Sequence, residues 1–420
     1  MSERVLPYED ALAEVLRQAA SLPGQLSVES VALAAASGRV LAEPIAADRD
    51  QPPFPRSTRD GFAVRSGDLE RNGVRLALVG SVRAGERWTG RALGAGQAIE
   101  IMTGAPVPDG ADTVLMVEHA ALTGGELQPE PGRRLSAGEN VVPAGAEARA
   151  GAVLIPPGRL AGVAEVGLAA SCGYVALRVF RQPAVAIVAT GDELVEVGTA
   201  PEAWQIRNSN SYTLAALVEG EAAEARRLAV ARDTREDLRE RLREAQEADL
   251  VLFSGGVSMG KYDLVEDALR EAGAEFLFTG ARIQPGKPVV FGRLPRQGAA
   301  GRDAKSAGWT YFFGLPGNPI STEVCFRLFA APLLRALGGR TELAPRFAEA
   351  RLAEDVRGGA KVTRFLPALV EGDWAGVTVR PVPWQGSGDL AANARANGFV
   401  VLPLGVERFS AGETVRVLLR

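Results

Sequence analysis

An alternation of apolar and amphipathic segments between Pro183 and Leu337 constrains the fold more than any other feature of the sequence. The runs PAVAIVAT and DLVLFSGG are too continuously apolar for a sheet with one face in water. Helical patterns such as NSYTLAALVEGE and TREDLRERLREAQEA lie between such runs. The alternation predicts a mostly parallel sheet covered by helices on both faces. Ligands of such sheets bind beyond the carboxyl ends of the strands.

The flanking segments have different patterns. The first ~24 residues predict one amphipathic helix that ends at the Pro23-Gly24 pair. Short strands separated by Gly and Pro dominate from about residue 74 to about 180, and alternating segments from about residue 340 onward predict a small β-rich domain. The polar segment 297–308 reads as a mobile hairpin loop.

Composition excludes several classes of function. The 47 basic and 51 acidic residues give a net charge of −4, which provides no general attraction to nucleic acid or to an anionic membrane. Apolar runs stay below about 18 residues, so neither a membrane span nor a signal sequence is predicted. The two cysteines, Cys172 and Cys325, support neither a disulfide framework nor a zinc site, and they fit a reducing cytoplasm. His119 is the single histidine, so Ser-His-Asp and His-metal chemistry lack material.

Three Gly/Pro-rich segments follow apolar runs in the alternating region, namely SGGVSMGKYD (254–263), QPGKP (284–288) and GLPGNP (314–319). Such loops at strand ends let backbone N–H groups approach an anion. The first matches the start of a P-loop through Gly260 and Lys261, but Tyr262 stands where Mg²⁺ binding needs Ser or Thr. An oxyanion-binding loop and a structural glycine turn both remain open.

The other two loops also have two interpretations. Lys287 lies between two prolines, which makes it either a fixed point charge for an oxyanion or part of a solvated turn. GLPGNP precedes a helix that would begin at Pro319, so it offers either free helix N-terminal amides or only a tight strand-helix connection.

Carboxylates recur at turn positions, where each alone is a typical cap or turn residue. Carboxylates near bound phosphate groups normally imply a divalent cation between them, because oxygen ligands suit Mg²⁺ and like charges repel. The residues in question are Asp60, Asp192, Glu193, Asp233 and Asp263.

Seven segments in order resemble the MoeA family, the molybdopterin molybdenumtransferases that include the gephyrin E domain. They are PPFPRSTRDGFAV, MTGAPVPDGADTVLMVE, ATGDELVEVG, RNSN, SGGVSMGKYD, QPGKPVVFG and GLPGNPISTEV. The resemblance runs from about residue 7 to the C-terminus. It implies a multidomain α/β plus β protein with a MogA/MoaB-like three-layer α/β sheet domain, a β-rich second domain and a small C-terminal β domain.

The resemblance also implies domain limits and an assembly. The expected parts are an N-terminal helix (1–26), a segmented connector (27–50 and 147–180), β-rich domain II (51–146), molybdopterin-binding domain III (181–337) and β domain IV (338–420). Family members form an elongated homodimer whose active site lies between domain III of one chain and domain II of the other. A cytoplasmic location is expected, and a MogA-type adenylyltransferase and molybdoenzyme apoproteins are possible partners.

The family's reaction joins adenylylated molybdopterin and molybdate with Mg²⁺, releases AMP and leaves molybdenum cofactor. Such a reaction needs positioned anions and a cation rather than a side-chain nucleophile. The resemblance implies catalytic roles for Glu193, Asp60 and Asp263, and metal binding by these three together with Asp233. Substrate binding is implied for Thr103, Asp192, Ser254, Gly255, Gly256, Ser258, Lys261, Lys287, Pro316, Gly317, Asn318 and Pro319.

Five positions depart from the usual family pattern, namely Arg59, Asn140, Asn208, Lys261 and Gln284. A cation lost at 284 and gained at 261 would compensate if the two loops face one ligand. Two other functions stay open: a non-catalytic molybdopterin-binding or scaffold protein of the same fold, and an unrelated phosphate-binding enzyme. Molybdate and tungstate have nearly the same size and charge, so the sequence does not separate them.

Overall fold

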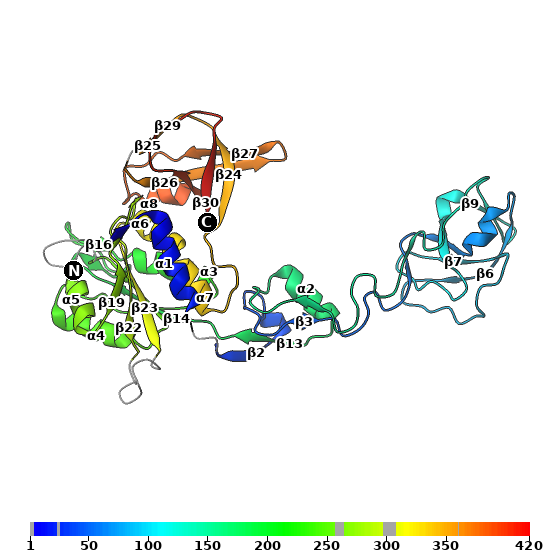
Figure 1. Cartoon of the computed structure of the whole chain (residues 1–420), viewed down its shortest axis with the longest axis horizontal. Coiled ribbons are helices and arrows are strands. Elements are labelled where there is room, and N and C mark those ends of the chain that lie inside the picture. Colours follow the sequence, from blue (N-terminus) through cyan, green and yellow to red (C-terminus); the bar gives the residue numbers. More distant parts are fainter. Residues whose placement is uncertain (1–3, 23–25, 257–263, 297–307, 360) are drawn as a thin grey trace.

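The computed structural model describes residues 4–22, 26–256, 264–296, 308–359 and 361–420. The molecule is elongated (Figure 1): a three-layer domain and a C-terminal barrel lie at one end, a narrow connector follows, and a β-rich lobe forms the other end. The predicted loop 297–308 falls almost wholly outside the described residues. Within the described ranges no helix is both long and apolar enough to cross a membrane.

The central sheet of the three-layer domain has six strands, of which four are parallel. Its order is β17 (Glu224–Arg227), β14 (Ala184–Ala189), β18 (Leu250–Ser254), β23 (Trp309–Leu315), β22 (Val290–Pro295) and β19 (Glu275–Phe278). The prediction of a mostly parallel sheet is confirmed. β22 runs antiparallel to both β23 and β19. Only the short strands β20 (Gly280–Ala281) and β21 (Ile283–Gln284), with no helix, connect β19 to β22, so the pair lacks the crossover that parallel strands need.

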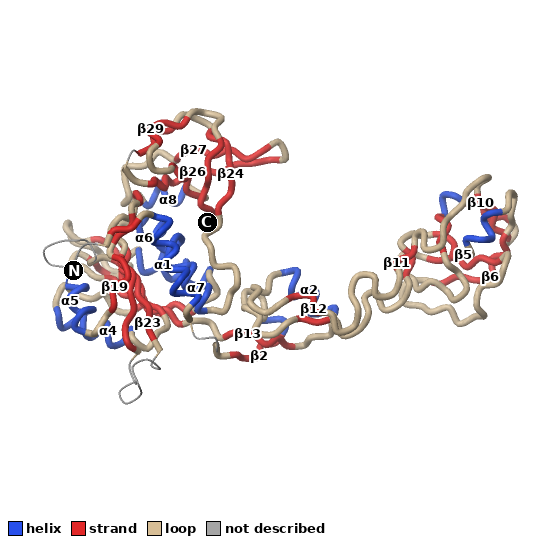
Figure 2. Tube along the Cα trace, viewed as in Figure 1, coloured by secondary structure: helices blue, strands red, loops and turns tan. Residues whose placement is uncertain are grey.

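Helices cover both faces of this sheet, as Figure 2 shows. Successive residues of β18 point to opposite faces: Leu250 and Leu252 join one core, while Val251 and Phe253 join the other. The first core also contains α1 (Tyr8–Ala20), α3 (Asn210–Gly220), α6 (Pro319–Cys325) and α7 (Ala331–Leu337). The second contains α4 (Arg235–Ala245) and α5 (Leu264–Glu271).

The N-terminal helix is therefore part of the three-layer domain. α1 packs along α7, and β1 (Val5–Leu6) pairs in parallel with β20. Ala11 and Val15 are fully buried in the shared core. The apolar face of α1 is buried against a domain that begins more than 150 residues later in the sequence. A local sequence pattern predicts the helix but not this contact.

The connector is built from two separate chain segments that pair with each other. β2 (Val28–Ala32) lies against β13 (Ala176–Phe180), and β3 (Ile45–Ala46) against β12 (Val153–Ile155). α2 (Val163–Ser171) covers them. Two chain segments run from the connector to the distal lobe, so the small core of the connector orients this lobe.

The distal lobe carries a six-stranded sheet with a core on each face. Its order is β8 (Thr113–Met116), β5 (Gly61–Val64), β7 (Gln97–Ile101), β6 (Leu76–Val82), β10 (Glu126–Pro129) and β9 (Ala120–Thr123). A short pair, β4 (Arg56–Ser57) with β11 (Val141–Val142), joins it to the connector. His119 contacts Glu130 at 2.9 Å on the surface of this lobe.

The C-terminal domain is a closed barrel. The strands β26 (Thr363–Asp373), β27 (Gly376–Pro381), β24 (Phe347–Leu352), β30 (Thr414–Leu419) and β28 (Gly398–Leu402) follow one another, and β28 pairs again with β26. Closure removes the exposed edges of the sheet. β21 of the three-layer domain pairs with β26, and α8 (Leu390–Arg395) faces α6, so the two domains share a border.

Candidate active site

The carboxyl ends of the parallel strands meet in register at one edge of the central sheet. Ala189 pairs with Ser254, and Ser254 with Leu315, which are the last residues of β14, β18 and β23. Val290 at the start of the antiparallel β22 pairs with Gly314. The structure thereby brings the TGDEL, SGG, QPGKP and GLPGNP segments to the same edge.

A cavity of about 340 Å³ opens at this edge. Of the predicted site residues, the lining includes Glu193, Ser254, Gly255, Gly317, Asn318 and Pro319. It also contains residues that the sequence analysis did not select: Thr190, Arg207, Ser209 and Asn210 from the three-layer domain, and Gly388 and Leu390 from the barrel. The barrel segment QGSGDLA has a turn-rich composition before α8, but only the tertiary structure shows that it closes this cavity.

Asn210, the last residue of the RNSN segment, ties the loops together. Its amide donates to Ser254 Oγ at 2.9 Å and to the Gly317 carbonyl at 2.7 Å. Its Oδ1 atom, like the hydroxyl oxygen of Thr190, is buried without a hydrogen-bond partner among the described residues. Buried polar atoms are almost always satisfied, so two such atoms beside one cavity indicate that a polar ligand belongs there.

The glycines after β18 allow a close approach between loops. A Cβ atom on Gly256, whose φ is +64°, would lie 2.6 Å from Thr190 Oγ1 and 2.8 Å from Val265 Cγ2. Gly255, with φ +90°, would place one 2.7 Å from the Thr190 carbonyl oxygen. The Gly255 amide donates to the Leu315 carbonyl at 3.2 Å. This amide therefore extends the sheet, which favours the structural glycine turn at Gly255. Substrate binding by the loop stays a prediction.

The helix N-terminus after GLPGNP is also partly occupied. The Ile320 amide donates to the carbonyl of Ser387 in the barrel at 3.0 Å, and the Thr322 hydroxyl donates to the Pro316 carbonyl at 2.6 Å. Pro319 has no N–H to offer. The structure thus supports the tight strand-helix connection at this loop and adds an interdomain contact, while Gly317 and Asn318 remain exposed beside the cavity.

Glu193 lines the cavity, and two further carboxylates, Asp192 and Asp233, lie near it outside the lining. The side chain of Glu193 lies over Gly191, where a Cβ atom would be 2.5 Å from Glu193 Oε2. The Asp233 amide donates to Asp192 Oδ1 at 3.3 Å. Burial raises the pKa of Asp233, and the negative charges of Asp192 and Glu193 raise it further. The described residues include no cluster of three potential ligands close enough for a metal ion. Asp263, Ser258 and Lys261 lie outside the described residues.

Lys287 lies at the same edge of the sheet but does not line the cavity. Its side chain is exposed, and its carbonyl accepts hydrogen bonds from the amides of Ala281 and Val289. The preceding Gly286 has φ +108° and lies so close to Cys325 that a Cβ atom would be 2.5 Å from Sγ. The stiff loop is thus packed on the end of α6.

Asp60 and Thr103 lie far from this cavity, in the distal lobe (Figure 2). Asp60 Oδ1 accepts hydrogen bonds from the Thr103 amide at 2.7 Å and from the Thr103 hydroxyl at 2.8 Å. These two bonds lower the pKa of Asp60. Within one chain the predicted acidic residues that the structure describes therefore form two groups, and Asp60 does not meet Asp192, Glu193 and Asp233.

Comparisons with known proteins agree with this architecture. Family models match three consecutive regions: the MoeA N-terminal region (domain I and II) at 6–173, the probable molybdopterin binding domain at 186–336, and the MoeA C-terminal region (domain IV) at 349–419. The chain belongs to the MoeA family. Its sheet domain is the region that matches the probable molybdopterin binding domain.

Similar proteins cover the whole chain. A molybdopterin molybdenumtransferase of Staphylococcus aureus strain Mu50 is 33% identical over 99% of this chain and 95% of its own length. One of Bacillus subtilis strain 168 is 33% identical over 97% and 93%. The crystal structure of a molybdopterin biosynthesis MoeA protein from Pyrococcus horikoshii OT3 has a TM-score of 0.80, at 27% identity, and covers 99% of this chain and 100% of that chain.

Two departures from the usual MoeA pattern have local structural roles. Asn208 is buried, and its Oδ1 accepts the Ser211 amide at the start of α3 at 3.2 Å. Asn140 adopts φ +61°, a conformation that Asn tolerates better than most residues, and its side chain donates to the Val114 carbonyl. Neither role needs a negative charge. Arg59 and Gln284 are exposed, and the structure gives no reason for either.

Proposed function

We propose that this protein is a molybdopterin molybdenumtransferase, which inserts molybdenum from molybdate into adenylylated molybdopterin and releases AMP. The curated relatives that cover nearly the whole chain carry this name. The observation that supports the proposal most directly is the cavity at the carboxyl edge of the molybdopterin-binding domain. It combines unsatisfied polar atoms on Asn210 and Thr190 with the Glu193 carboxylate.

The residues around the cavity suit a positioning mechanism. The buried Thr190 hydroxyl can donate a hydrogen bond to a bound anion. Asn210 Oδ1 can only accept, so it suits an N–H or O–H group of the substrate, because the Asn210 amide nitrogen already donates to Ser254 and Gly317. The lining also contains the guanidinium-bearing Arg207. No nucleophilic side chain is required. Cleavage of the pyrophosphate bond needs only an oxygen nucleophile, from water or molybdate, with AMP as the leaving group. Molybdenum then exchanges oxygen ligands, lost as water, for the two dithiolene sulfurs of the substrate, so the protein mainly holds the reactants in place.

The described carboxylates of one chain do not by themselves make a site with three ligands, so Mg²⁺ would need a further ligand from elsewhere. Burial raises the pKa of Asp233, and the negative charges of Asp192 and Glu193 raise it further; a divalent cation would neutralise these charges. We infer that these carboxylates hold Mg²⁺ together with Asp60 of the partner subunit. When bound, the ion would neutralise charge on the phosphate oxygens and so make AMP a better leaving group.

A homodimer would bring the two acidic groups together. The long connector holds Asp60 and Thr103 away from the cavity of their own chain, so a second copy must supply them if both groups serve one reaction. We further propose a cytoplasmic location and transient contacts with a MogA-type adenylyltransferase and with molybdoenzyme apoproteins.

The test is a reconstituted reaction with the purified protein, adenylylated molybdopterin, molybdate and Mg²⁺. Molybdate-dependent AMP release together with active cofactor is the expected result. Glu193→Gln should keep the fold and lose most turnover, whereas Glu202→Gln, an exposed change in the segment after β15 (Leu194–Val195), should not. Tight substrate binding without AMP release would instead identify a binding or scaffold protein of the same fold.

A further inference from the structure

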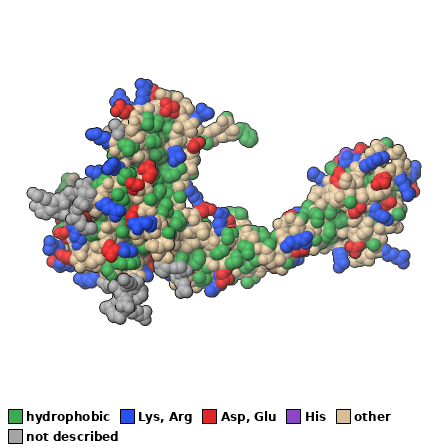
Figure 3. Space-filling model, viewed as in Figure 1, with side chains coloured by type: hydrophobic (Ala, Val, Ile, Leu, Met, Phe, Trp, Pro, Cys, Tyr) green, Lys and Arg blue, Asp and Glu red, His purple; other side chains and the backbone are tan. Residues whose placement is uncertain are grey.

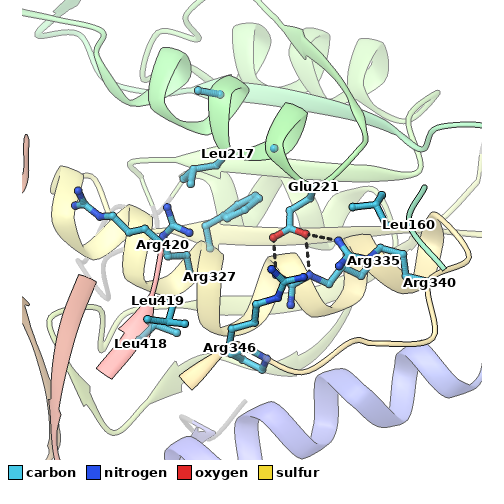
Figure 4. Close-up of a pocket in the computed structure, with 14 residues that line it drawn as sticks. Leu160, Leu217, Glu221, Arg327, Arg335, Arg340, Arg346, Leu418, Leu419 and Arg420 are labelled. Atoms are coloured by element: carbon cyan, nitrogen blue, oxygen red, sulfur yellow. Dashed lines mark hydrogen bonds and ion pairs between the residues drawn. The ribbon is translucent and has the colours of Figure 1, made fainter. Parts of the chain in front are cut away.

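A second cavity, of about 280 Å³, lies where the connector, the three-layer domain and the barrel meet. It lies at the C-terminal end of α3 and after α6, whereas the candidate active site lies at the N-terminal ends of these helices. Its lining carries five arginines: Arg327, Arg335, Arg340, Arg346 and Arg420. Glu221 is the one carboxylate in the described lining. Figure 4 shows the guanidinium groups arranged around this space, with Glu221 at one side.

The ion pairs in the wall leave positive charge uncompensated. Glu221 binds two arginines at once: Arg335 at 2.5 Å and Arg340 at 3.0 Å. Glu323, which does not line the cavity, likewise forms ion pairs with both Arg327 and Arg420. Two carboxylates thus serve four guanidinium groups.

Arg346 adds a further positive charge. It has no hydrogen-bonded or ion-paired side-chain partner within the described part of the chain, and its side chain is exposed at the cavity mouth. Burial lowers the pKa of Arg340, and the charges of Arg335 and Arg346 lower it further, against the opposing effect of Glu221. The arginines therefore repel one another in a space where Glu221 is the one acidic side chain of the described lining, and it already pairs with two of them.

The guanidinium groups are also held in place before any ligand arrives. Arg335 donates to both oxygens of Glu221 and to the carbonyls of Leu343 and Ala344. Arg420 donates to Asn393 and Ala396. The side chains of Arg335, Arg340 and Arg327 are only 10%, 6% and 20% exposed. Arg335 and Arg420 use most of their N–H groups in these bonds, so the donors left for a ligand belong mainly to Arg327, Arg340 and Arg346. Side chains that are already fixed lose little conformational entropy on binding.

We propose that this cavity binds a small phosphate-bearing anion of the size of inorganic diphosphate. The volume is below that of most sites for drug-sized molecules, which favours a compact ligand. Charge-assisted bonds from several arginines would compensate its desolvation. The proposal does not depend on the proposed enzymatic reaction, because the cavity shares no lining residue with the candidate active site.

Binding at this place would link three parts of the molecule. Leu160 of the connector lines the cavity, and the adjacent Arg159 forms an ion pair with Glu342 in the segment between α7 and the barrel. The Thr341 amide donates to the Gly158 carbonyl at 3.1 Å. An anion held by Arg335 from α7 and Arg346 from the barrel side would add to these contacts and fix the connector relative to the other two domains.

The test is isothermal titration of the full chain with sodium diphosphate in magnesium-free buffer at constant ionic strength. Arg346→Ala and Arg327→Ala should each weaken binding about tenfold, as expected when one charge-assisted bond is lost. Arg351→Ala, which removes an exposed arginine at the other end of β24, should bind like the wild type. Asn210→Ala distinguishes diphosphate binding in this cavity from binding in the candidate active site. Because Asn210 lines only the latter, the variant should bind diphosphate in the arginine-lined cavity like the wild type.

Diphosphate should also raise the melting temperature of the wild type and of Arg351→Ala but not that of Arg346→Ala. Equal affinity in the wild type, Arg346→Ala and Arg327→Ala would overturn the proposal. So would an absence of diphosphate binding in the wild type, or a loss of binding in Arg351→Ala as large as that in Arg346→Ala, since the latter indicates nonspecific attraction to surface charge. Both cavity variants keep the Glu221 ion pairs, so circular dichroism should show an unchanged fold.

Discussion

Asp60 is held by two hydrogen bonds from one residue, the backbone amide and the hydroxyl of Thr103. Two hydrogen bonds from Thr103 lower its pKa and hold Oδ1 in one position on the distal lobe. Thr103→Ala removes the hydroxyl bond and keeps the amide bond, so the pKa of Asp60 should rise toward its ordinary value. The acid limb of the activity profile should then move to higher pH, because a lowered pKa keeps the carboxylate ionised as pH falls.

The pKa of Asp60 can be followed by NMR in protein labelled at the aspartate carboxyl carbon, with Asp60→Asn to assign the signal. Thr103→Ser keeps both donors and serves as the matched control. An unchanged Asp60 titration in Thr103→Ala would show that the backbone amide alone sets the pKa.

The pKa of Asp233 is shifted in the opposite direction to that of Asp60, and this shift affects the stability of the fold. Its folded-state pKa is raised by burial and by Asp192 and Glu193, so the folded state binds a proton more readily than the unfolded state. Stability from this group is therefore lost as pH rises from the ordinary aspartate pKa through the raised one. Asp233→Asn should remove the repulsion and raise the melting temperature near pH 7, by no more than about 2 °C for a partly exposed group, while activity falls.

Glu236→Gln provides a control with the opposite sign. It removes a charge from the first turn of α4, where an acidic side chain is favourable, so the melting temperature should fall slightly. A lower melting temperature in Asp233→Asn, measured by calorimetry at pH 7, would contradict the assigned repulsion.

At the scale of single residues, the sequence indicates which residues belong to the candidate site but not which hydrogen bonds they form. The glycines after β18 predict a loop in which two backbone segments can approach each other closely. The hydrogen bond from the Gly255 amide to the Leu315 carbonyl is not predictable in this way, because it depends on how β18 and β23 end side by side. Asn208 likewise differs from the usual family residue, and only its contact with the Ser211 amide shows why an uncharged cap suffices. The hydrogen-bond partner, rather than the residue type, decides the role.

At the scale of elements, the β18 loop is the most constrained connection of the candidate site. Gly256→Ala should cost about 1–2 kcal/mol for its left-handed backbone and about 1–3 kcal/mol more for overlap with Thr190 and Val265. Gly273→Ala, also at positive φ but with no atom closer than 3.8 Å, should cost only the backbone part. Chemical denaturation of both variants checks the difference, and equal losses would show that the loop relaxes around the new methyl group.

The elements of the three-layer domain were predictable because their patterns are long and regular. The sequence indicates β14, β18 and the charged helix α4 through continuous apolar runs and a 3.6-residue period. The antiparallel strands β22 and β19 were harder, because a buried strand is equally apolar in either direction. The barrel contribution to the cavity, at Gly388 and Leu390, has no signature beyond a turn before α8.

At the scale of the whole molecule, the sequence establishes the order of the domains but not the distances between them. Periodicity is a local property, whereas the separation of the distal lobe from the central sheet depends on how two connector segments pair. The predicted acidic residues therefore appear as one set in the sequence and as two groups in space. A shared active site would then require two chains.

This arrangement makes a quantitative prediction for mixed dimers. If the protein forms the proposed homodimer, Asp60→Asn and Glu193→Gln should each inactivate it, because each removes one half of both shared sites. A mixed dimer would combine the intact Glu193 of one subunit with the intact Asp60 of the other, and so restore one of its two sites. Random assembly from equal amounts should therefore recover about a quarter of the wild-type activity.

Co-expression of the two variants with different affinity tags allows the mixed dimer to be purified. This mixed dimer should have about half of the wild-type activity. The double variant Asp60→Asn/Glu193→Gln, paired with wild type under the same tags, is the matched control. Its mixed dimer carries one defect in each site and should be inactive, although it contains the same number of substitutions. Equal activity in the two mixed dimers would mean that the distal lobe does not act on the cavity of the other chain. Asp60 would then need a role other than completing that site.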